Sequence, residues 1–418
     1  MSAAISARRP GRKRLLTVGH SYVLRSNRRL PEAIQEAANG EWQVTVAAPR
    51  FYRGNPRFGD LKPETLHVDA AETVDVVSVP VAFTNRVHFA LYGARLRRLM
   101  ASGFDAIHCW EEPFILSGAQ MAHWAPRDAS LTYFSFQNIA KSYPPPFNWL
   151  ERRALERADG WVAAATLVEQ ALKDRPVYRE RPYRVIGVGV DPKRFRPDPQ
   201  AGALVRASLG WADDDVPVVG YLGRFTEPKG LPVLLRALDA IQRPWRALFV
   251  GSGTLEGDLR RWGERYGSRV NIATGVPHDD VPVYLNAMDV LCVPSQTTPK
   301  WREQFGRVLI EAFACGVSVV ASDSGEIPYV VADAGQIVGE RDERGWRREI
   351  EALLADGARR RDFGTRGLAR VAAHYTWSAI GAKYVAFFDD LERSKRGRVA
   401  RNDRSFPLFF ARLRGDAL

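Results

Sequence analysis

The sequence predicts an α/β protein built from two doubly wound, Rossmann-like domains. The chain has 418 residues, which is too long for one compact hydrophobic core and indicates two domains. Short apolar strands alternate with helical segments along it, a pattern typical of parallel sheets with right-handed crossovers. A strand that ends in a glycine turn and is followed by a helix occurs in each half, first at Gly19 and again at Gly223.

The first half is expected to contain one parallel sheet. Apolar runs bounded by turn residues predict strands at 14–18, 43–48, 75–79, 105–109, 130–134 and 184–188, and a helix at about 28–38. The first strand ends at Gly19, but the G-x-G-x-x-G fingerprint of a dinucleotide site is absent. This half therefore has the strand–turn–helix order of a Rossmann domain without predicting a dinucleotide cofactor.

The second half repeats this organisation. Strands are predicted at 216–222, 247–250, 271–275, 290–294 and 317–321, and helices at 231–238, 281–287 and 308–315. Gly316 stands where a left-handed helix C-cap belongs, so the segment 290–321 predicts a strand, a helix and a parallel strand. Ligands of such sheets bind at the carboxyl ends of the strands, where the loop that carries Glu303 must lie.

Two carboxylates stand out in this segment. Glu303 precedes the helix, and Glu311 interrupts its otherwise apolar sequence. A carboxylate buried without a partner costs on the order of several kcal/mol, so Glu311 requires hydrogen-bond donors, which sugar hydroxyls can supply. Gly306 lets a ligand approach the start of the helix, where free N–H groups and the helix dipole favour phosphate. The alternative interpretation is a half-exposed Glu311 and a solvated loop acid at Glu303.

The segment EQFGRVLIEAFACG at 303–316, with the later Val-Val-Ala-Ser and Glu-Ile-Pro, closely resembles the E-x7-E segment of the family 4 retaining glycosyltransferases of the bacterial cell-envelope and exopolysaccharide type. The resemblance covers nearly the whole chain and is strongest at 217–331. It implies the GT-B architecture, in which two Rossmann-like domains face a cleft that holds the nucleotide-sugar donor. The implied parts are an acceptor domain at 1–195, a donor domain at 196–377, a helix at 378–393 that crosses back to the first domain, and a basic tail at 394–418.

The resemblance also implies roles for individual residues. Arg224 and Lys229 match the basic pair that meets the donor diphosphate, and Glu303 would face the donor sugar, so these three form the catalytic set. A guanidinium and an ammonium can neutralise a departing pyrophosphate without a metal. The alternative interpretation is that both side chains are ordinary surface cations. Glu311 would hold the ribose hydroxyls. The remaining donor-binding positions are Phe305, Gly306, Arg307, Val308, Gly19, Gly223, Gly251 and Gly253.

The acceptor side is expected in the loop after the strand at 130–134. Many family members have a functional histidine there, but Gln137 holds that position, so no histidine role is carried over. Gln137, Asn138 and Lys141 are instead assigned as polar contacts to the acceptor. The alternative is a loop stabilised by its own hydrogen bonds. Further along, Gly189 and the residues after it resemble the family's hinge between the domains.

The sequence predicts neither a metal site nor a cofactor, and the expected substrate is a UDP- or GDP-sugar. Its seven histidines are scattered without ligand spacing. The D-x-D pattern at 213–215 precedes a strand in a linker, where a solvated turn is expected. Cys109, Cys292 and Cys315 occur in apolar contexts, which indicates reduced core thiols in a cytosolic protein.

The formal charge of +12 indicates anionic partners, such as a nucleotide, a lipid phosphate, a membrane face or a nucleic acid. Two stretches combine arginines with apolar side chains. They are Arg95, Arg97 and Arg98 with Phe89, Leu91, Leu96 and Leu99, and the tail arginines with Phe406, Leu408, Phe409 and Phe410. We therefore expect a cytoplasmic protein held peripherally at the inner face of the cell membrane, with solvated basic faces as the alternative.

Together these features predict a retaining, metal-independent glycosyltransferase that moves a hexosyl group from a nucleotide-diphosphate sugar to a hydroxyl of a glycan or lipid-linked acceptor. A GT-B sugar-nucleotide epimerase is an alternative, since it shares the architecture. A nucleic-acid-binding protein is a second alternative, because it would explain the charge. It would interleave basic and aromatic residues on one module, whereas the basic residues here are spread over both ends of the chain, so no nucleic-acid partner is expected.

Overall fold

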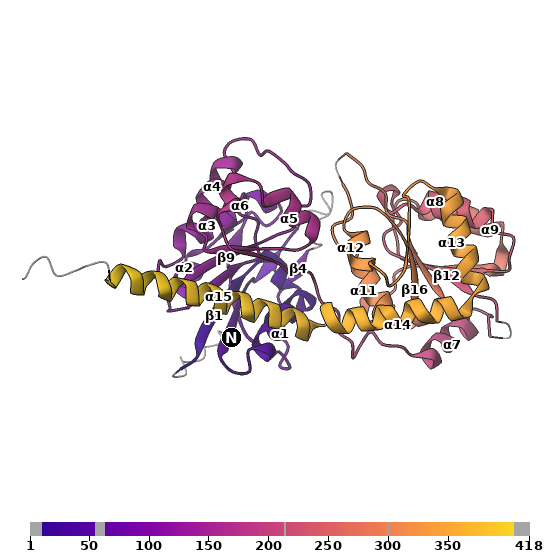
Figure 1. Ribbon diagram of the computed structural model, residues 1–418, viewed down its shortest axis with the longest axis horizontal. Coiled ribbons are helices and arrows are strands. Elements are labelled where there is room, and N and C mark those ends of the chain that lie inside the picture. Colours follow the sequence, from indigo (N-terminus) through magenta and orange to yellow (C-terminus); the bar gives the residue numbers. More distant parts are fainter. Residues whose placement is uncertain (1–10, 55–62, 213–214, 300, 405–418) are drawn as a thin grey trace, which may run out of the picture.

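Residues 11–54, 63–212, 215–299 and 301–404 are described by a computed structural model of the protein. They form two α/β domains that lie side by side, each with a central parallel sheet flanked by helices (Figure 1). The chain passes from the first domain to the second near residue 190, and its last helix returns to the first domain.

The N-terminal domain has a parallel sheet whose seven described strands follow the order β11-β10-β9-β8-β1-β2-β5. The strands are β1 (Lys13–Val18), β2 (Trp42–Pro49), β5 (Asp75–Val79), β8 (Ala106–Cys109), β9 (Ser130–Ser135), β10 (Gly160–Ala163) and β11 (Tyr183–Val185). The strands expected from the sequence are confirmed, except that the one expected at 184–188 ends at Val185. The structure adds β10, whose Gly-Trp-Val-Ala sequence is too short to show a period.

Helices and short turns complete this domain. They are α1 (Arg29–Ala37), α2 (Ala94–Met100), α3 (Leu116–Trp124), α4 (Phe147–Arg157), α5 (Thr166–Leu172) and α6 (Pro176–Arg179), with the 3-10 turns η1 (His20–Val23), η2 (Arg25–Arg28) and η4 (Val87–Phe89). Two antiparallel pairs join β3 (Phe51–Tyr52) to β4 (Glu64–Thr65) and β6 (Val81–Ala82) to β7 (Leu91–Tyr92). Because helices cover the parallel sheet, its central strands are continuous apolar runs, and Leu15, Leu16 and Ile107 are fully buried.

The C-terminal domain has a parallel sheet in the order β14-β13-β12-β15-β16-β17 within the described residues. Its strands are β12 (Val218–Leu222), β13 (Arg246–Val250), β14 (Val270–Ala273), β15 (Val290–Val293), β16 (Ser318–Ser322) and β17 (Gln336–Val338). Its helices are α7 (Pro199–Ser208), α8 (Leu231–Asp239), α9 (Glu256–Glu264), α10 (Val281–Asn286), α11 (Arg307–Ala314), α12 (Ile327–Val331), α13 (Glu343–Ala355) and α14 (Gly357–His374), with η5 (Glu227–Lys229), η6 (Gly267–Arg269) and η7 (His278–Asp280). Val290 pairs with Ser318, which confirms the parallel strand pair expected around α11.

The order of strands locates a switch point in each sheet. In the C-terminal sheet β12 and β15 are neighbours. The chain adds β13 and β14 on one side of β12, and it adds β16 and β17 beyond β15 on the other side. In the N-terminal sheet the same reversal occurs between β1 and β8. Ligands of open α/β sheets bind beyond the carboxyl ends of strands at such points. A ligand-binding site is therefore expected at the loops that follow β12 and β15 or at those that follow β1 and β8.

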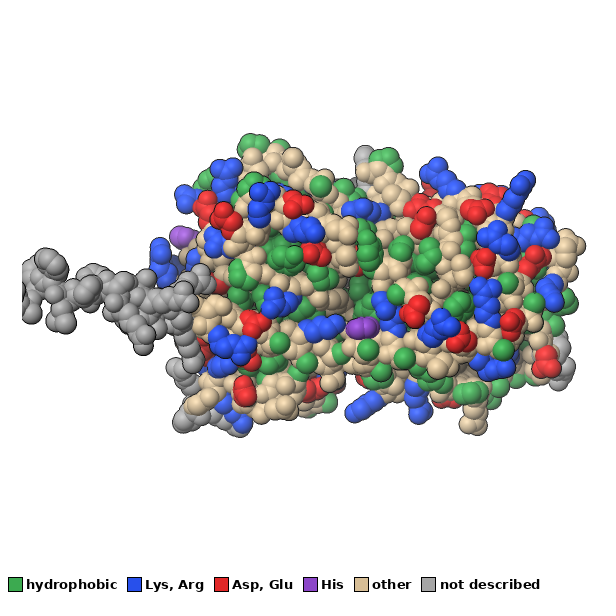
Figure 2. Space-filling view, in the orientation of Figure 1, with side chains coloured by type: hydrophobic (Ala, Val, Ile, Leu, Met, Phe, Trp, Pro, Cys, Tyr) green, Lys and Arg blue, Asp and Glu red, His purple; other side chains and the backbone are tan. Residues whose placement is uncertain are grey.

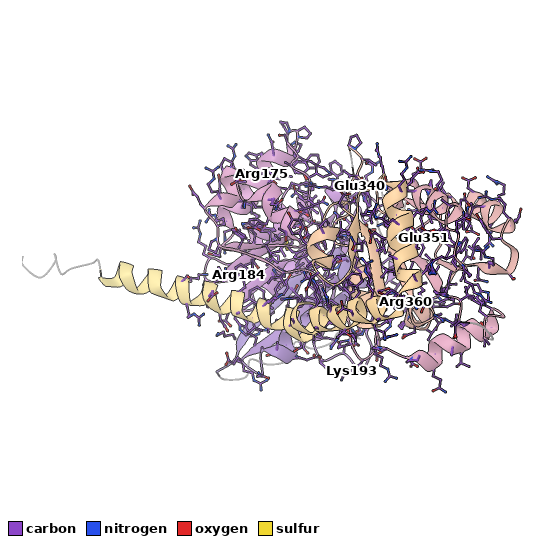
Figure 3. All side chains as sticks on the ribbon, turned by 45° about the vertical axis from the view of Figure 1, so that its right-hand side comes forward. Arg175, Arg184, Lys193, Glu340, Glu351 and Arg360 are labelled. Carbon is purple, nitrogen blue, oxygen red and sulfur yellow. The ribbon has the colours of Figure 1, made fainter. Side chains whose placement is uncertain are left out.

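The last helix, α15 (Trp377–Arg404), ties the two halves of the chain together (Figure 1). Its apolar side chains, including Tyr384 and Phe388, join the core of the N-terminal domain. Gly381 allows close contact, since a Cβ there would lie 2.2 Å from the carbonyl oxygen of Ala33 in α1. On its exposed face, Arg184 of β11 lies 2.7 Å from Asp390 (Figure 3).

This helix is longer than the expected segment 378–393, so the expectation that residues from 394 onward form a separate tail is wrong up to Arg404. The physical reason is composition, because the stretch 393–404 is rich in arginine, which favours helix, and contains no proline. The tail residues Phe406, Leu408, Phe409 and Phe410 lie outside the described residues.

The connection between the domains lies beside the start of α15. The Val190 N–H donates to the Tyr375 carbonyl at 2.8 Å, and a Cβ on Gly189 would lie 2.6 Å from the Trp377 ring. A Cβ on Gly187 would approach the Phe305 ring equally closely, at 2.6 Å. Small residues are therefore required at 187 and 189 because aromatic side chains of the second domain and of α15 pack on the connecting segment.

None of the helices in the described residues combines the length and the apolar composition needed to cross a lipid bilayer. The cysteines behave as expected, since Cys109, Cys292 and Cys315 are buried and free. Burial raises the pKa of the Cys292 thiol beyond its ordinary range, and it raises the pKa of Cys315 to about 12.

Candidate active site

The loops after β12 and β15 bring Lys229 and Glu303 into contact at the switch point of the C-terminal sheet. The Lys229 ammonium lies 2.5 Å from Glu303 Oε2, and the Ser295 hydroxyl donates to the same oxygen at 2.9 Å. Lys229 also lies over the Trp301 ring, 4.9 Å from its centroid. Gly230 follows in the left-handed conformation, with a φ of 73°. Two residues of the expected catalytic set thus lie together.

The loop that carries Glu303 is held from the far edge of the sheet. Glu340, just beyond β17 and labelled in Figure 3, accepts the Thr297 N–H at 2.6 Å and also binds the Thr297 hydroxyl. That hydroxyl lies 3.0 Å from the Ser324 hydroxyl. A charged acceptor therefore orders a long polar loop that the sequence alone left without structure.

Arg224 lies at the same end of β12, but its surroundings differ from those of Lys229. Its side chain is exposed, and it forms no ion pair or hydrogen bond with the described residues. A Cβ on Gly251 would lie 1.9 Å from the Gly223 carbonyl oxygen, and a Cβ on Gly253 would lie 2.3 Å from that of Phe225. The glycine turn after β13 is therefore packed under the loop that presents Arg224, which is a structural reason for both glycines.

Glu311 is the most unusual group in this domain. It lies on the buried face of α11 and is 5% exposed, and no hydrogen bond from the described residues reaches its carboxylate. Burial raises its pKa from 4.5 to about 7, while the nearby cations Arg307 and Arg194 act in the opposite direction. The half-exposed interpretation of Glu311 is thus wrong, because the helix turns this face into the protein.

The start of α11 offers backbone rather than side chains. Gly306 caps the helix in the left-handed conformation, with a φ of 79°, and a Cβ there would lie 2.8 Å from Leu309. Phe305 is buried against the connecting segment and Tyr375, and Val308 packs on the core of the domain. The first-turn N–H groups and the exposed Arg307 side chain are therefore the groups at this helix end that could bind a ligand.

The expected acceptor-side residues have three different surroundings. The Gln137 amide is used within its own domain, donating to Glu112 at 2.9 Å and accepting from Tyr143 at 2.8 Å. Asn138 is buried and donates across the cleft to the carbonyl oxygens of Arg302 and Glu303, each at 3.3 Å. Lys141 is exposed. Asn138 therefore connects the domains, and Gln137 fits the alternative of a loop stabilised by its own hydrogen bonds.

The switch point of the N-terminal sheet holds a constellation that sequence reasoning missed. His20 follows β1 and Glu111 follows β8, and they form two bonds, from His20 N–H at 2.7 Å and between Nδ1 and the carboxylate at 2.8 Å. Tyr92 donates to Glu111 at 2.7 Å, and the His20 ring stacks on Tyr52. Despite burial, these partners hold the pKa of Glu111 below its ordinary value.

Gly19 belongs to this N-terminal cluster. A Cβ there would lie 2.8 Å from the Trp110 Cβ, so the strand end and Trp110 need a glycine to pack together. The sequence signal that could have located the cluster is the pair of strand ends at Gly19 and Cys109, each with a titratable residue one or two positions later. Their adjacency follows only from the strand order.

A second histidine at a strand end is a core residue. His108 is fully buried, its Nδ1 lies 2.8 Å from the Thr132 hydroxyl, and its ring packs against Tyr384 and Phe388 of α15. Burial lowers its pKa to about 3. His108 therefore stays neutral and supports the docking of α15 rather than proton transfer.

Among the described residues, no three His, Cys, Asp or Glu side chains are grouped to hold a metal ion.

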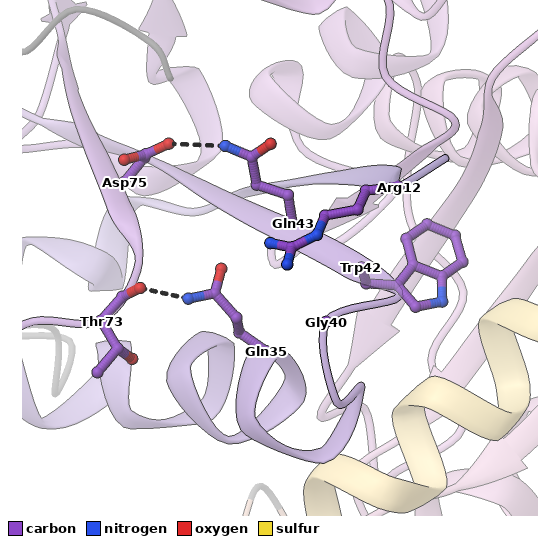
Figure 4. Close-up of a pocket in the computed structure, with 7 residues that line it drawn as sticks. All are labelled: Arg12, Gln35, Gly40, Trp42, Gln43, Thr73 and Asp75. Carbon is purple, nitrogen blue, oxygen red and sulfur yellow. Dashed lines mark hydrogen bonds between the residues drawn. The ribbon is translucent and has the colours of Figure 1, made fainter. Parts of the chain in front are cut away.

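A cavity of about 250 Å³ lies at the opposite end of the N-terminal sheet, where β1, β2 and β5 begin (Figure 4). Its polar side chains are partly paired, since Gln43 donates to Asp75 at 3.3 Å and Gln35 donates to the Thr73 carbonyl. Its position away from the carboxyl ends of the strands makes it a poor candidate for the site.

Comparisons with known proteins find matches to both halves of the chain. The model for "Glycosyltransferase Family 4" matches residues 3–194, and the model for "Glycosyl transferases group 1" matches residues 207–370. A GDP-mannose-dependent alpha-(1-6)-phosphatidylinositol monomannoside mannosyltransferase from Mycolicibacterium smegmatis is 35% identical over 47% of this chain and 53% of that protein. The D-inositol 3-phosphate glycosyltransferase of Stackebrandtia nassauensis is 31% identical over 76% of this chain and 74% of that protein.

The chain spans about half the length of the first of these relatives and about three quarters of the second. An Anabaena protein, solved in complex with UDP and glucose, has a TM-score of 0.66 and 17% identity, covering 90% of this chain and 100% of that one. The likeness confirms the expected fold class, GT-B, with two Rossmann-like domains facing a cleft.

Proposed function

Because the chain belongs to glycosyltransferase family 4, we propose that it moves a hexosyl group from a nucleotide-diphosphate sugar to a hydroxyl of a glycan or lipid-linked acceptor. The observation that carries this proposal is Glu311. A buried carboxylate with a pKa near 7 and no hydrogen-bond partner in the described residues is suited to a ligand that brings paired hydroxyl donors. The ribose of a nucleotide carries such a pair.

The rest of the donor fits around this point. With the ribose at Glu311, the diphosphate lies at the start of α11, where first-turn N–H groups and the helix dipole favour an anion. Arg224 and Lys229 add two positive charges from the loop after β12. Cations and oriented N–H groups that stabilise the departing diphosphate supply the role that a metal ion has in other transferases, so the reaction proceeds without one.

Lys229 and Glu303 form an exchangeable pair. In this structure the ammonium is 2.5 Å from the carboxylate, and an arriving diphosphate competes for the same ammonium. Glu303 is then available to accept a hydroxyl of the donor sugar. The acceptor oxygen attacks the anomeric carbon from the face of the leaving group, the bond to the phosphate oxygen breaks, and the acceptor proton passes to the phosphate, which retains the anomeric configuration.

A lipid-linked acceptor would lie at a membrane, so this proposal includes a surface that binds the membrane. The expected anchor on α2 is wrong in part, because Leu96 and Leu99 belong to the core of the N-terminal domain. Aromatic side chains nearby are exposed instead, with Phe83 60%, Phe89 46% and Trp149 55% exposed.

Phe83 and Phe89 lie in the segment that connects β6 to β7, and Trp149 lies in the first turn of α4. The Phe89 ring is 5.9 Å from the Phe147 ring, which is also in the first turn of α4. Exposed arginines lie on the adjoining helices: Arg95, Arg97 and Arg98 on α2, and Arg152 and Arg153 on α4. By contrast, on the face drawn in Figure 2 basic and acidic side chains are interspersed. We propose that the aromatic and basic surface holds the protein reversibly at the inner, anionic face of a membrane.

Two experiments test the proposal. In a thermal-shift panel of UDP, GDP, ADP and their sugars, one nucleotide at about 100 times its Kd should stabilise the protein by about 2.7 kcal/mol, and no response to any of them contradicts the donor site. Flotation with anionic and neutral vesicles tests the surface. Binding to anionic vesicles that is lost in Phe89→Ser/Trp149→Ser supports the membrane proposal, whereas equal flotation of the variant, or none of the wild type at low salt, excludes this anchor.

A further inference from the structure

Glu326, in the turn before α12 of the C-terminal domain, is bound by the other domain. Its Oε1 accepts the N–H of Thr166 at 2.7 Å and its Oε2 accepts the N–H of Leu167 at 2.9 Å. These two residues open α5 of the N-terminal domain. Glu326 is 4% exposed, and both of its carboxylate oxygens accept from N–H groups that have no partner within the helix.

The same turn contacts the backbone of Glu303. The Glu326 N–H donates to the Glu303 carbonyl at 3.1 Å, and a Cβ on Gly325 would lie 2.1 Å from that oxygen. From the opposite domain, the Asn138 amide reaches the same carbonyl at 3.3 Å. The backbone of Glu303 is therefore held between a turn that binds α5 and an amide of the N-terminal domain.

The contacts between the domains at this point are few. Beside Glu326 and Asn138, the Gln170 amide of α5 donates to the Tyr329 hydroxyl of α12 at 3.2 Å, the Gln304 amide donates to the Phe136 carbonyl at 3.1 Å, and Phe305 packs on the segment at 187. A cavity of about 260 Å³ borders the Glu326 contact and separates it from the start of α15. Of these contacts, only the pair of hydrogen bonds to Glu326 has a carboxylate as acceptor, and such charge-assisted bonds are stronger than bonds between neutral groups.

We propose that Glu326 is a positioning residue for glycosyl transfer, because its bond to α5 holds the domains closed and thereby sets the backbone of Glu303. When the domains part, water hydrates both the carboxylate and the α5 N–H groups, so this contact forms only in the closed arrangement. The effect on transfer depends on the proposed function, whereas the contact and its effect on closure do not.

Two substitutions remove the contact from opposite sides. Glu326→Gln leaves one acceptor oxygen and places an NH₂ group against an N–H donor. Thr166→Pro removes a donor N–H from α5, and proline is tolerated there because position 166 is the first of the helix and Ala165 is extended, with φ −160° and ψ 162°. Thr166→Ser keeps both the N–H and the hydroxyl that binds Glu326, and Glu343→Gln removes a surface carboxylate paired with Arg236, so these two serve as controls.

Small-angle X-ray scattering on the full chain, with and without UDP or GDP, measures closure directly. We expect Glu326→Gln and Thr166→Pro to have a larger radius of gyration than the wild type and the two controls. Scattering profiles that match the wild type in both variants overturn the proposal. This readout is independent of whether the protein turns over a sugar donor.

Kinetics and calorimetry test the link to Glu303. The assay is release of nucleoside diphosphate from UDP-glucose or GDP-mannose, and each variant should lower kcat at least tenfold. The double variant should be no slower than the slower single variant. The Kd for UDP or GDP should change less than about twofold in each variant. Additive losses, or an unchanged kcat, overturn the proposal. If no nucleotide binds to the wild type, the proposed function fails instead, and scattering still decides the contact.

Discussion

Replacing Glu311 by glutamine should make the ligand-free protein more stable and a poorer nucleotide binder. Burial raises the pKa of Glu311 from 4.5 to about 7. At about 1.4 kcal/mol per pKa unit, this difference corresponds to about 3 kcal/mol that ionised Glu311 costs the folded state. Since the pKa is higher in the folded than in the unfolded chain, the cost is absent below pH 4.5, grows as pH rises towards 7, and is complete above it.

The assay is thermal unfolding of the wild type and Glu311→Gln, without nucleotide, at pH 8 and pH 5. At pH 8 the variant should gain up to about 3 kcal/mol, or on the order of 5–10 °C in Tm for a domain of this size, and the gain should shrink markedly at pH 5. Glu343→Gln, which removes an exposed carboxylate, controls for the loss of one negative charge. A variant that gains nothing at pH 8, or gains equally at both values, refutes the reasoning.

The same substitution should reduce affinity for the nucleotide. A hydrogen bond to a charged group contributes about 1.5–3 kcal/mol, so calorimetry should find a Kd at least tenfold higher in a folded Glu311→Gln or Glu311→Ala protein. Because hydroxyl donors favour the ionised carboxylate, wild-type affinity should also rise between pH 6 and pH 8, and the variant should lack this dependence. An unchanged Kd in the folded variant contradicts the ribose assignment.

Further predictions concern the diphosphate and the reaction. Arg224→Ala/Lys229→Ala should weaken UDP or GDP binding at least tenfold with little change in Tm, and calorimetry with an unaltered Kd would argue against the basic pair. Turnover should survive EDTA, because the diphosphate is neutralised by these side chains and by the start of α11; loss of activity that Mg²⁺ or Mn²⁺ restores would refute this. The product should keep the anomeric configuration of the donor by NMR, and inversion would exclude the retaining mechanism.

Much of the fold could be predicted from sequence because its signals are local. Each strand of the second sheet from β12 to β16 is a mostly apolar segment of four or five residues, and each lies within a few residues of its expected place. The helix between Gly306 and Gly316 was equally readable, because both glycines are left-handed caps and the residues between them are apolar. From that helix the burial of Glu311 could be anticipated, since its neighbours on both sides are core residues.

The alternation of strands and helices could therefore be read from local patterns, and so could the position of Glu303 and Glu311 around one helix. The partners that these elements meet depend on how the whole chain packs. Leucines at 96 and 99 have the same spacing whether they face a core or a membrane, and their contacts with the sheet settle the choice. His20 and Glu111 lie 91 positions apart, and Asn138 and Glu303 lie 165 apart, so no local pattern relates them. Periodicity encodes which face of an element is apolar, whereas long-range pairing depends on strand order and domain closure, which arise only when the whole chain packs.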